Sequence, residues 1–232
     1  MSSPCFHLKK FDVYHDLCAM KVGTDGVLLG AWVNTENPKR ILDVGTGSGL
    51  IALMLAQRTN AKIDAIEIDI SGYIQAVKNV AESTWPDRIK VINADFGSYL
   101  FEDNYDIIVS NPPFFRNSLK APSKGRSLAR HDETLTWKQL IDKSAGLLSP
   151  DGRFSVILPI EADGVFDAIC WQYKLYLTRR CAVITTEGND PKRLLLEFSF
   201  KRTMTEHTNL TIETSEHRRT TAFSNITSDF YL

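Results

Sequence analysis

Short apolar runs alternate along this chain with longer stretches of helical periodicity. Non-alternating apolar runs are typical of strands that are buried on both faces of a parallel sheet. Five of them predict strands at residues 40–44, 62–68, 89–93, 105–110 and 152–158. Helical patterns fill the gaps at residues 49–57, 74–82, 136–147 and 161–173. This alternation predicts an α/β domain with a doubly wound parallel sheet and right-handed crossovers.

The pattern changes after residue 158. Two β-rich runs, 175–186 and 193–202, are separated only by residues 187–192, and a connection that short joins antiparallel strands. The whole pattern therefore predicts a seven-stranded mixed sheet with helices on both faces. We expect one domain over residues 1–232, with a core at 40–202 between an amino-terminal segment, 1–39, and a carboxyl-terminal extension, 203–232. The extension holds either a last strand near residues 210–212 or mostly surface loop.

Composition narrows the class of protein only slightly. With 43% hydrophobic and 24% charged residues, the chain fits a globular domain rather than a disordered one. The four cysteines form no C-x-x-C pair, which is typical of reduced cytosolic thiols and suggests no metal site. The amino terminus lacks the apolar region of a signal peptide, and no apolar run approaches about 18 residues. We therefore expect a cytoplasmic protein that does not span a membrane.

The first strand leads into a glycine-rich loop, Asp43-Val44-Gly45-Thr46-Gly47-Ser48-Gly49. Glycines let the backbone turn tightly and let a ligand approach it closely. The spacing differs from the Gly-x-Gly-x-x-Gly of dinucleotide sites. Asp43 would repel a phosphate but attract the ammonium group of an amino acid. With Gly45 and Gly47 as its contact points, the loop favours S-adenosylmethionine over NAD.

Further acidic residues follow the next two strands. Glu67 lies 24 residues after Asp43, at the position of an acid that accepts hydrogen bonds from ribose hydroxyls, and Asp69 is a close competitor for that role. Asp95 could accept a hydrogen bond from the adenine amino group, and Phe96 could cover the base. The simpler alternative for Asp95 is a cap or a solvated turn.

The fourth strand ends in Asn111-Pro112-Pro113-Phe114. Prolines cannot continue a ladder, so the strand stops and presents an amide, a carbonyl and an aromatic ring at the sheet edge. If the Asn111 side-chain oxygen and the Pro112 carbonyl accept hydrogen bonds from the two N–H groups of a planar amine, its lone pair is directed toward a methyl donor. Phe114 would stack on a flipped base, with Phe115 beside it or in the core.

A basic stretch follows this motif. No acidic residue occurs from position 107 to 131, and the stretch carries six cationic or titratable side chains: Arg116, Lys120, Lys124, Arg126, Arg130 and His131. Next to a base pocket, such a stretch favours contact with nucleic-acid phosphates. Residues 192–193 and 201–202 could extend this surface.

The sequence resembles the bacterial tRNA1(Val) adenine N6-methyltransferases, which modify the adenine just 3′ of the anticodon. The most specific likeness lies in residues 11–14 and 20–32, Met-Lys-Val-Gly-Thr-Asp-Gly-Val-Leu-Leu-Gly-Ala-Trp, and residues 228–232 are also similar. The resemblance implies a Rossmann-like class I methyltransferase in which Lys21, Thr24 and Asp25 line the cofactor pocket. It implies S-adenosylmethionine as cofactor and the anticodon arm of valine tRNA as partner. We separately expect the protein to act as a monomer.

Other enzymes with Asn-Pro-Pro-aromatic motifs methylate glutamine amides, guanine N2 in ribosomal RNA, or adenine in DNA. About forty residues before the first strand leave little room for the recognition domain of the glutamine enzymes, and no DNA-recognition insert is visible. The alternatives that remain are another small RNA N6-adenine or N2-guanine methyltransferase, less readily a glutamine N5-methyltransferase, and a non-catalytic module that binds S-adenosylmethionine and RNA.

Overall fold

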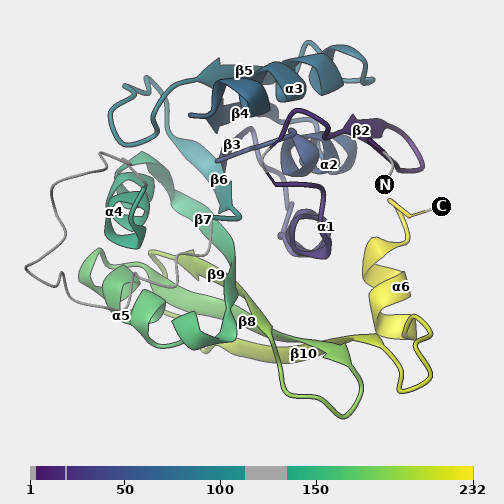
Figure 1. Cartoon of the computed structure of the whole chain (residues 1–232). Helices are drawn as coiled ribbons and strands as arrows, with labels where there is room; N and C mark the ends of the chain where they lie inside the picture. Colours follow the sequence, from purple (N-terminus) through teal and green to yellow (C-terminus); the bar gives the residue numbers. More distant parts are fainter. Residues whose placement is uncertain (1–3, 19, 113–134, 232) are drawn as a thin grey trace, which may run out of the picture.

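The computed structural model describes residues 4–18, 20–112 and 135–231 (Figure 1). Its centre is a twisted mixed sheet with strand order β10-β8-β9-β7-β6-β3-β4-β5. Neighbouring strands are parallel except at β9, which runs antiparallel to both β7 and β8. The strands are β3 (Arg40–Val44), β4 (Lys62–Glu67), β5 (Ile89–Asn93), β6 (Tyr105–Ser110), β7 (Leu148–Pro159), β8 (Tyr176–Thr186), β9 (Arg193–Ser199) and β10 (Glu206–Glu213).

The sheet has eight strands, so the prediction of seven was one short. The additional strand is β10, which pairs in parallel with β8 at the edge of the sheet, with Leu210 opposite Val183. Most of its side chains are exposed or half-buried, and Leu210 alone is buried. An edge strand with so little apolar surface lacks the hydrophobic run on which the prediction depended.

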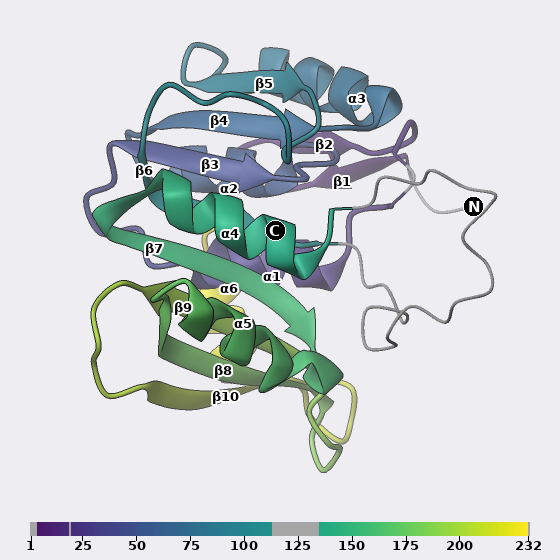
Figure 2. The same cartoon turned by 90° about the vertical axis from the view of Figure 1, so that its left-hand side faces the viewer.

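Helices cover both faces of the sheet, as predicted. In Figure 1, α4 (Trp137–Leu147) and α5 (Val165–Gln172) lie on one side, while α1 (Thr24–Trp32), α2 (Leu50–Arg58) and α6 (Thr221–Thr227) lie on the other. Figure 2 looks onto the face that α4 and α5 cover. Successive strand residues enter opposite cores: Ile107 packs with the α1 and α2 side, and Ile108 with the α4 and α5 side. Burial of both faces explains the continuous apolar runs.

Local capping sets several helix boundaries that periodicity placed differently. The helix α3 (Ile70–Ala81) begins four residues before the predicted start, because the Asp69 carboxylate accepts a hydrogen bond from Gly72 N at 2.7 Å. The predicted helix at 161–173 is instead a 3-10 turn, Ile160–Ala162, followed by α5. Gly164 separates the two with φ +76°, a left-handed conformation that ends helical geometry.

The two ends of the chain meet on the α1 side of the sheet. Residues near the amino terminus form a hairpin of β1 (Cys5–His7) and β2 (Asp12–Tyr14). In the loop of this hairpin, Lys9 N donates to Phe230 O at 2.8 Å, and Lys9 Nζ donates to Ser228 O at 2.7 Å. The carboxyl-terminal extension therefore supports the amino-terminal segment. Among the described residues, no helix is long and apolar enough to span a bilayer.

Candidate active site

A cavity of about 580 Å³ opens at the carboxyl ends of β3, β4, β5 and β6, below the first turn of α1. This edge is where ligands bind in open α/β sheets. The cavity is lined by ten of the residues predicted from sequence: Lys21, Thr24, Asp25, Gly45, Gly47, Glu67, Asp95, Phe96, Asn111 and Pro112. Segments far apart in the sequence thus converge on one site.

The glycine loop forms the floor of the cavity. Gly45 and Gly47 have φ of +72° and +56°, which residues with a side chain rarely adopt. A Cβ atom added at either position meets nothing within 4 Å, so the backbone faces open space. The N–H groups of Gly45 and Thr46 donate to Ile66 O at 2.9 and 3.1 Å, which fixes the loop against the end of β4. A ligand can therefore approach this backbone closely.

Asp43 does not line the cavity, contrary to the prediction that it contacts the cofactor. Its side chain is fully buried below the loop, where Oδ2 accepts hydrogen bonds from Thr46 Oγ1 at 2.5 Å and Ala52 N at 3.1 Å. Because Asp43 is the penultimate residue of β3, its side chain points into the protein rather than past the strand end. Burial raises the pKa of this carboxyl to about 7, although the bonds from Thr46 and Ala52 act in the opposite direction. Its role is to shape the loop.

Glu67, at the end of β4, connects the glycine loop to the start of α3. Oε2 accepts a hydrogen bond from Gly47 N at 2.8 Å, and Oε1 accepts one from Asp69 N at 2.9 Å. These bonds hold the carboxylate at the cavity wall and leave it further lone pairs for hydroxyl donors. Asp69, the competing residue, also lines the cavity but serves as the α3 cap. This geometry favours Glu67 as the acceptor for a diol.

Asp95 is both a turn cap and a wall of the cavity. It accepts hydrogen bonds from Gly97 N and Ser98 N at 3.0 and 2.9 Å. Burial acts to raise the pKa of this carboxyl, but the bonds from Ser98 and Gly97 and the charge of Lys143 outweigh it and lower the pKa. Phe96 is only 4% exposed and forms an apolar surface next to Asp95. The two alternatives from the sequence, a cap and a ligand contact, are therefore compatible.

The amino-terminal segment is held over the cavity by two buried polar residues of α3 that the sequence analysis missed. Asn79 donates to Tyr14 O at 2.7 Å and to Ser48 O at 2.8 Å, which connects β2 to the glycine loop. Gln75 accepts a hydrogen bond from Leu17 N at 3.2 Å. Lys21 Nζ donates to His15 O at 2.9 Å, which fixes its own segment. A signal existed in the sequence, since Gln75 and Asn79 lie one turn apart on the buried side of a helix.

Asn111 presents a buried acceptor that no residue in the described part of the chain pairs with. Its Oδ1 atom is buried, lines the same site as Pro112, and has no hydrogen-bond partner among the described residues. Ser110 Oγ donates to Val44 O at 2.9 Å, which fixes the end of β6 against β3. A buried amide oxygen without a donor is costly unless a ligand supplies one.

The other predicted residues of this region lie outside the described part of the chain. These are Pro113, Phe114, Phe115, Arg116, Lys120, Lys124, Arg126, Arg130 and His131.

Only one of the two suggested extensions of the basic surface lies near the cavity. Arg193 begins β9, which runs antiparallel to β7, so residues 192–193 lie at the cavity edge of the sheet. Residues 201–202 follow the other end of β9. There Lys201 pairs with Asp151 at 2.6 Å, and the guanidinium of Arg202 lies 4.9 Å from the centre of the Trp171 ring. Residues 201–202 therefore lie at the opposite ends of the strands from the cavity, because β9 runs from one side of the sheet to the other between residues 193 and 199.

One group in the described part of the chain brings three potential metal ligands together, on the β1–β2 hairpin. Ligand atoms of Cys5, His7 and Asp12 lie within 4.8 Å of one another, and His7 Nδ1 is 2.8 Å from Asp12 Oδ1. None of these three residues lines the cavity. The polar groups that line the cavity include carboxylates, backbone groups and an amide, which suit a nucleoside and an amino acid.

Comparison with known proteins agrees with this geometry. The methyltransferase small domain family matches residues 18–162. A curated tRNA1(Val) (adenine(37)-N6)-methyltransferase from Bacteroides fragilis is 47% identical, over all of this chain and 99% of its own length. One from Trichodesmium erythraeum is 44% identical, over 98% of this chain and 97% of its own length.

Solved structures share the fold. A predicted O-methyltransferase from Agrobacterium tumefaciens matches with a TM-score of 0.67 at 18% identity, covering 89% of this chain and 96% of its own. The glycopeptide N-methyltransferase MtfA in complex with S-adenosylmethionine has a TM-score of 0.56 at 12% identity, with coverages of 78% and 100%. These likenesses confirm the class I methyltransferase fold. The whole-length relatives confirm the resemblance seen in the sequence: this chain belongs to the tRNA1(Val) (adenine(37)-N6)-methyltransferase family.

Proposed function

We propose that this protein methylates the N6 amino group of adenine 37 in tRNA1(Val), beside the anticodon, with S-adenosylmethionine as methyl donor. The observation that carries the proposal is the buried Oδ1 of Asn111, which has no hydrogen-bond partner among the described residues and lies in a cavity at the carboxyl edge of the sheet. Whole-length relatives with this activity in their names support the choice of substrate.

The residues of the cavity fit S-adenosylmethionine. A volume of about 580 Å³ is within the usual range for small-molecule sites, roughly 300 to 1,000 Å³. Glu67 is positioned to accept from the ribose hydroxyls, with Asp95 and Phe96 at the adenine. The open backbone at Gly45 and Gly47 leaves room for the amino-acid part. When bound, the cofactor supplies an electrophilic methyl group.

The task of the protein is then to orient a poor nucleophile. The lone pair of an exocyclic amine is delocalised into the ring, so the nitrogen attacks weakly in its planar form. If Asn111 Oδ1 and the Pro112 carbonyl accept hydrogen bonds from the two N–H groups, the lone pair is directed toward the methyl donor. The nitrogen would take the methyl group as the bond between that group and the cofactor's sulfur breaks, which leaves S-adenosylhomocysteine. The methylated nitrogen would then lose one proton to solvent, so no strong general base is needed beforehand.

The substrate contacts follow from the same position on the sheet. Pro113, Phe114 and Phe115 come directly after Asn111 and Pro112, and we infer that an aromatic ring among them stacks on the extruded adenine. Arg116, Lys124, Arg126, Arg130 and His131 contact phosphates of the valine tRNA anticodon arm. All four cysteines are free thiols, which supports a cytoplasmic enzyme, and we propose that it acts as a monomer without metal.

The test is methylation of defined RNA. Purified protein, S-adenosylmethionine and unmodified tRNA1(Val) transcript should yield N6-methyladenosine, detected by nucleoside mass spectrometry. A transcript with guanine at position 37 is the matched control and should yield neither N6-methyladenosine nor N2-methylguanosine. If the transcript with guanine 37 is methylated to the same extent as the natural one, or if neither transcript is methylated, the proposed substrate is wrong.

A further inference from the structure

An ion pair connects the cofactor cavity to a strand outside it. Asp25 lies in the first turn of α1 and lines the cavity, and its Oδ2 accepts a hydrogen bond from Arg193 Nε at 2.8 Å. Arg193 begins β9 and is absent from the cavity lining. Both side chains are mostly shielded, with 26% and 34% exposed. Shielding of this kind strengthens the pair relative to one in open solvent.

Sheet topology shows which end of the cavity this pair serves. Glu67 and Asp95 follow β4 and β5, at one end of the strand row, while β9 lies past β3, β6 and β7. Four strand spacings separate β4 from β9, or about 19 Å across the sheet. Asp25 reaches toward β9, so it lies at the end of the cavity opposite the diol acceptor. Asn111, which follows β6, lies between the two ends.

The charge of this end matters for a zwitterionic ligand. A bare carboxylate would attract the ammonium group of an amino acid but repel its carboxylate. Arg193 occupies Oδ2 and balances the charge, and among the described residues Asp25 has no other hydrogen-bond partner. Oδ1 therefore keeps its accepting capacity next to the cavity.

We propose that Arg193 is a positioning residue for the cofactor: it holds the Asp25 carboxylate in place and neutralises it, so that Asp25 can accept a hydrogen bond from the ammonium group of the cofactor's amino-acid part. The inference rests on the proposed function, since it takes S-adenosylmethionine as the ligand. It assigns a role to a residue 168 positions away from Asp25 in the sequence.

The test compares two ligands that differ in the amino-acid part. S-adenosylhomocysteine carries this part, and 5′-methylthioadenosine lacks it. Calorimetry on Arg193→Gln should give a dissociation constant for S-adenosylhomocysteine about tenfold or more above that of the wild-type protein, because truncation leaves a charged partner unpaired. The constant for 5′-methylthioadenosine should stay within about twofold. Arg193→Lys should fall between, since lysine keeps the charge but not the planar geometry.

A matched control is Arg180→Gln, which removes another ion-paired arginine of the same sheet. Arg180 pairs with Asp163 and does not line the cavity, so both ligands should bind it as they bind the wild-type protein. Asp25→Asn is a second variant, should Arg193→Gln fail to fold, and should show the same split between ligands. The inference would be overturned if Arg193→Gln bound both ligands more weakly by the same factor, or if it bound both as tightly as the wild-type protein does. If the wild-type protein bound neither ligand, the proposed function would fail with it.

Discussion

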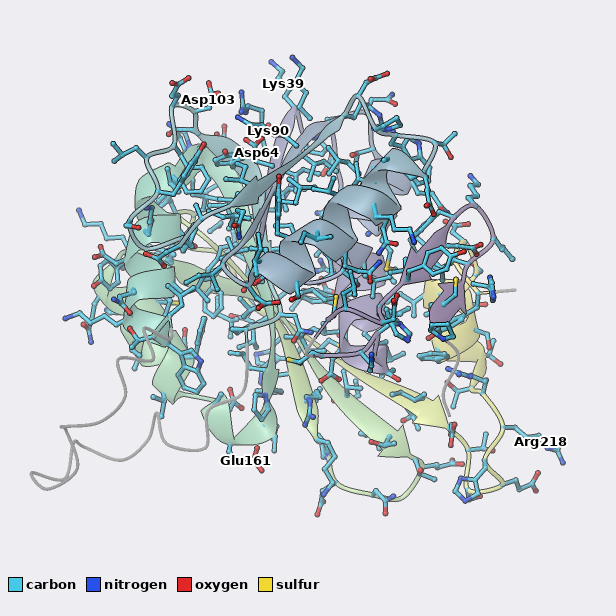
Figure 3. All side chains as sticks on the ribbon, turned by 45° about the horizontal axis from the view of Figure 1, so that its top comes forward. Lys39, Asp64, Lys90, Asp103, Glu161 and Arg218 are labelled. Atoms are coloured by element: carbon cyan, nitrogen blue, oxygen red, sulfur yellow. The ribbon has the colours of Figure 1, made fainter. Side chains whose placement is uncertain are left out.

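Two cavities of nearly equal size lie at the two ends of the strands, which we call the amino edge and the carboxyl edge of the sheet. The hydrogen bonding of their polar groups differs. The cavity at the amino ends of the strands measures about 570 Å³, against about 580 Å³ for the candidate active site. Figure 3 shows Asp64, Lys90 and Asp103 on one side of the molecule, with Glu161 beyond the carboxyl end of β7 on the other. Volume alone would not separate a binding site from a surface hollow.

At the amino edge, the charged groups largely satisfy one another. Arg40 pairs with Asp64 at 3.1 Å and also with Asp103, and Tyr105 Oη donates to Asp64 Oδ2 at 2.6 Å. The Arg40 guanidinium also lies 5.5 Å from the centre of the Tyr105 ring. One buried atom there, Arg40 Nε, has no partner in the described part of the chain. This network ties the starts of β3, β4 and β6 together and is structural.

At the carboxyl edge, the carboxylates are also hydrogen-bonded, but one buried acceptor that faces the cavity has no partner in the described part of the chain. Asn111 Oδ1 is buried beside the cavity without a hydrogen-bond partner among the described residues, and the backbone at Gly47 faces open space. Unsatisfied buried acceptors carry a free-energy cost that a ligand can relieve. The comparison teaches that the satisfaction of polar groups, rather than volume, identifies the functional edge.

The largest expected effect is on turnover. Asn111→Ala should lower the single-turnover methylation rate by about a hundredfold or more, because it removes an acceptor that is used in the transition state. The dissociation constant of S-adenosylmethionine should change by less than about fivefold. At the amino edge, Asp103→Asn should leave both quantities within about twofold of wild type. A parallel loss of cofactor binding in Asn111→Ala would make Asn111 a structural residue instead.

The buried Asp43 should make the stability of the protein depend on pH. Burial, opposed by the bonds from Thr46 and Ala52 and aided by the charge of Glu67, raises the pKa of this carboxyl from 3.8 to about 7. Between these values the native state binds more protons than the unfolded chain, so this group's contribution to stability falls as pH rises. The asparagine of Asp43→Asn does not titrate. The free energy of unfolding of this variant should therefore rise, relative to that of the wild-type protein, by up to about 1.4 kcal/mol per pH unit.

Urea denaturation at several pH values from about 4 to 8 measures this difference. The free energy of unfolding of Asp43→Asn minus that of the wild-type protein should increase up to about pH 7 and then level off. A constant difference over the whole range would show that Asp43 is ionised in the native state throughout, and its Oδ1 atom, which has no hydrogen-bond partner among the described residues, would then have no energetic role.

The smallest expected effects come from two glycine-to-alanine variants, one in the cavity and one away from it, which form a matched pair. The Cβ of Gly47→Ala points into open cavity, so S-adenosylmethionine should bind about tenfold more weakly, with a strain cost of about 1–2 kcal/mol at φ +56°. The Cβ of Gly152→Ala would lie 2.8 Å from the Leu148 side chain and 2.9 Å from Tyr105 O. That variant should lose about 1–3 kcal/mol of stability and keep its cofactor affinity. Calorimetry and urea denaturation of both variants test the contrast. Weaker cofactor binding in Gly152→Ala, with unchanged binding in Gly47→Ala, would contradict it.

Periodicity was enough to find the buried strands, but it failed for the first helix. In α1, seven consecutive residues from Gly26 to Trp32 are buried, so no polar face marks it as a helix. Gly30 lets it approach α2, since a Cβ there would lie 2.7 Å from Met54 Sδ. Without a polar stripe or a side-chain cap, nothing local distinguishes this segment from a loop, and only the family resemblance drew attention to it.

The sequence alone also placed acidic residues near strand ends without revealing their direction. Asp43 and Glu67 both occur at the carboxyl ends of parallel strands, yet Asp43 points into the core and Glu67 toward the cavity. Side chains alternate along a strand, so a shift of one residue in where the strand ends reverses the outcome. Boundaries are the least certain part of a sequence-based prediction, which is why this pair was not resolved.

The sequence by itself determined the order of the buried strands and of the helices between them, the glycine loop and the Asn-Pro-Pro-Phe motif, because these depend on local hydrophobicity and backbone constraints. Tertiary structure decided which polar groups remain without partners. The pair of Asp25 and Arg193 joins residues 168 positions apart, and the network at the amino edge unites β3, β4 and β6. Hydrogen bonds between distant segments leave no local pattern, since they form only when the strands are brought side by side.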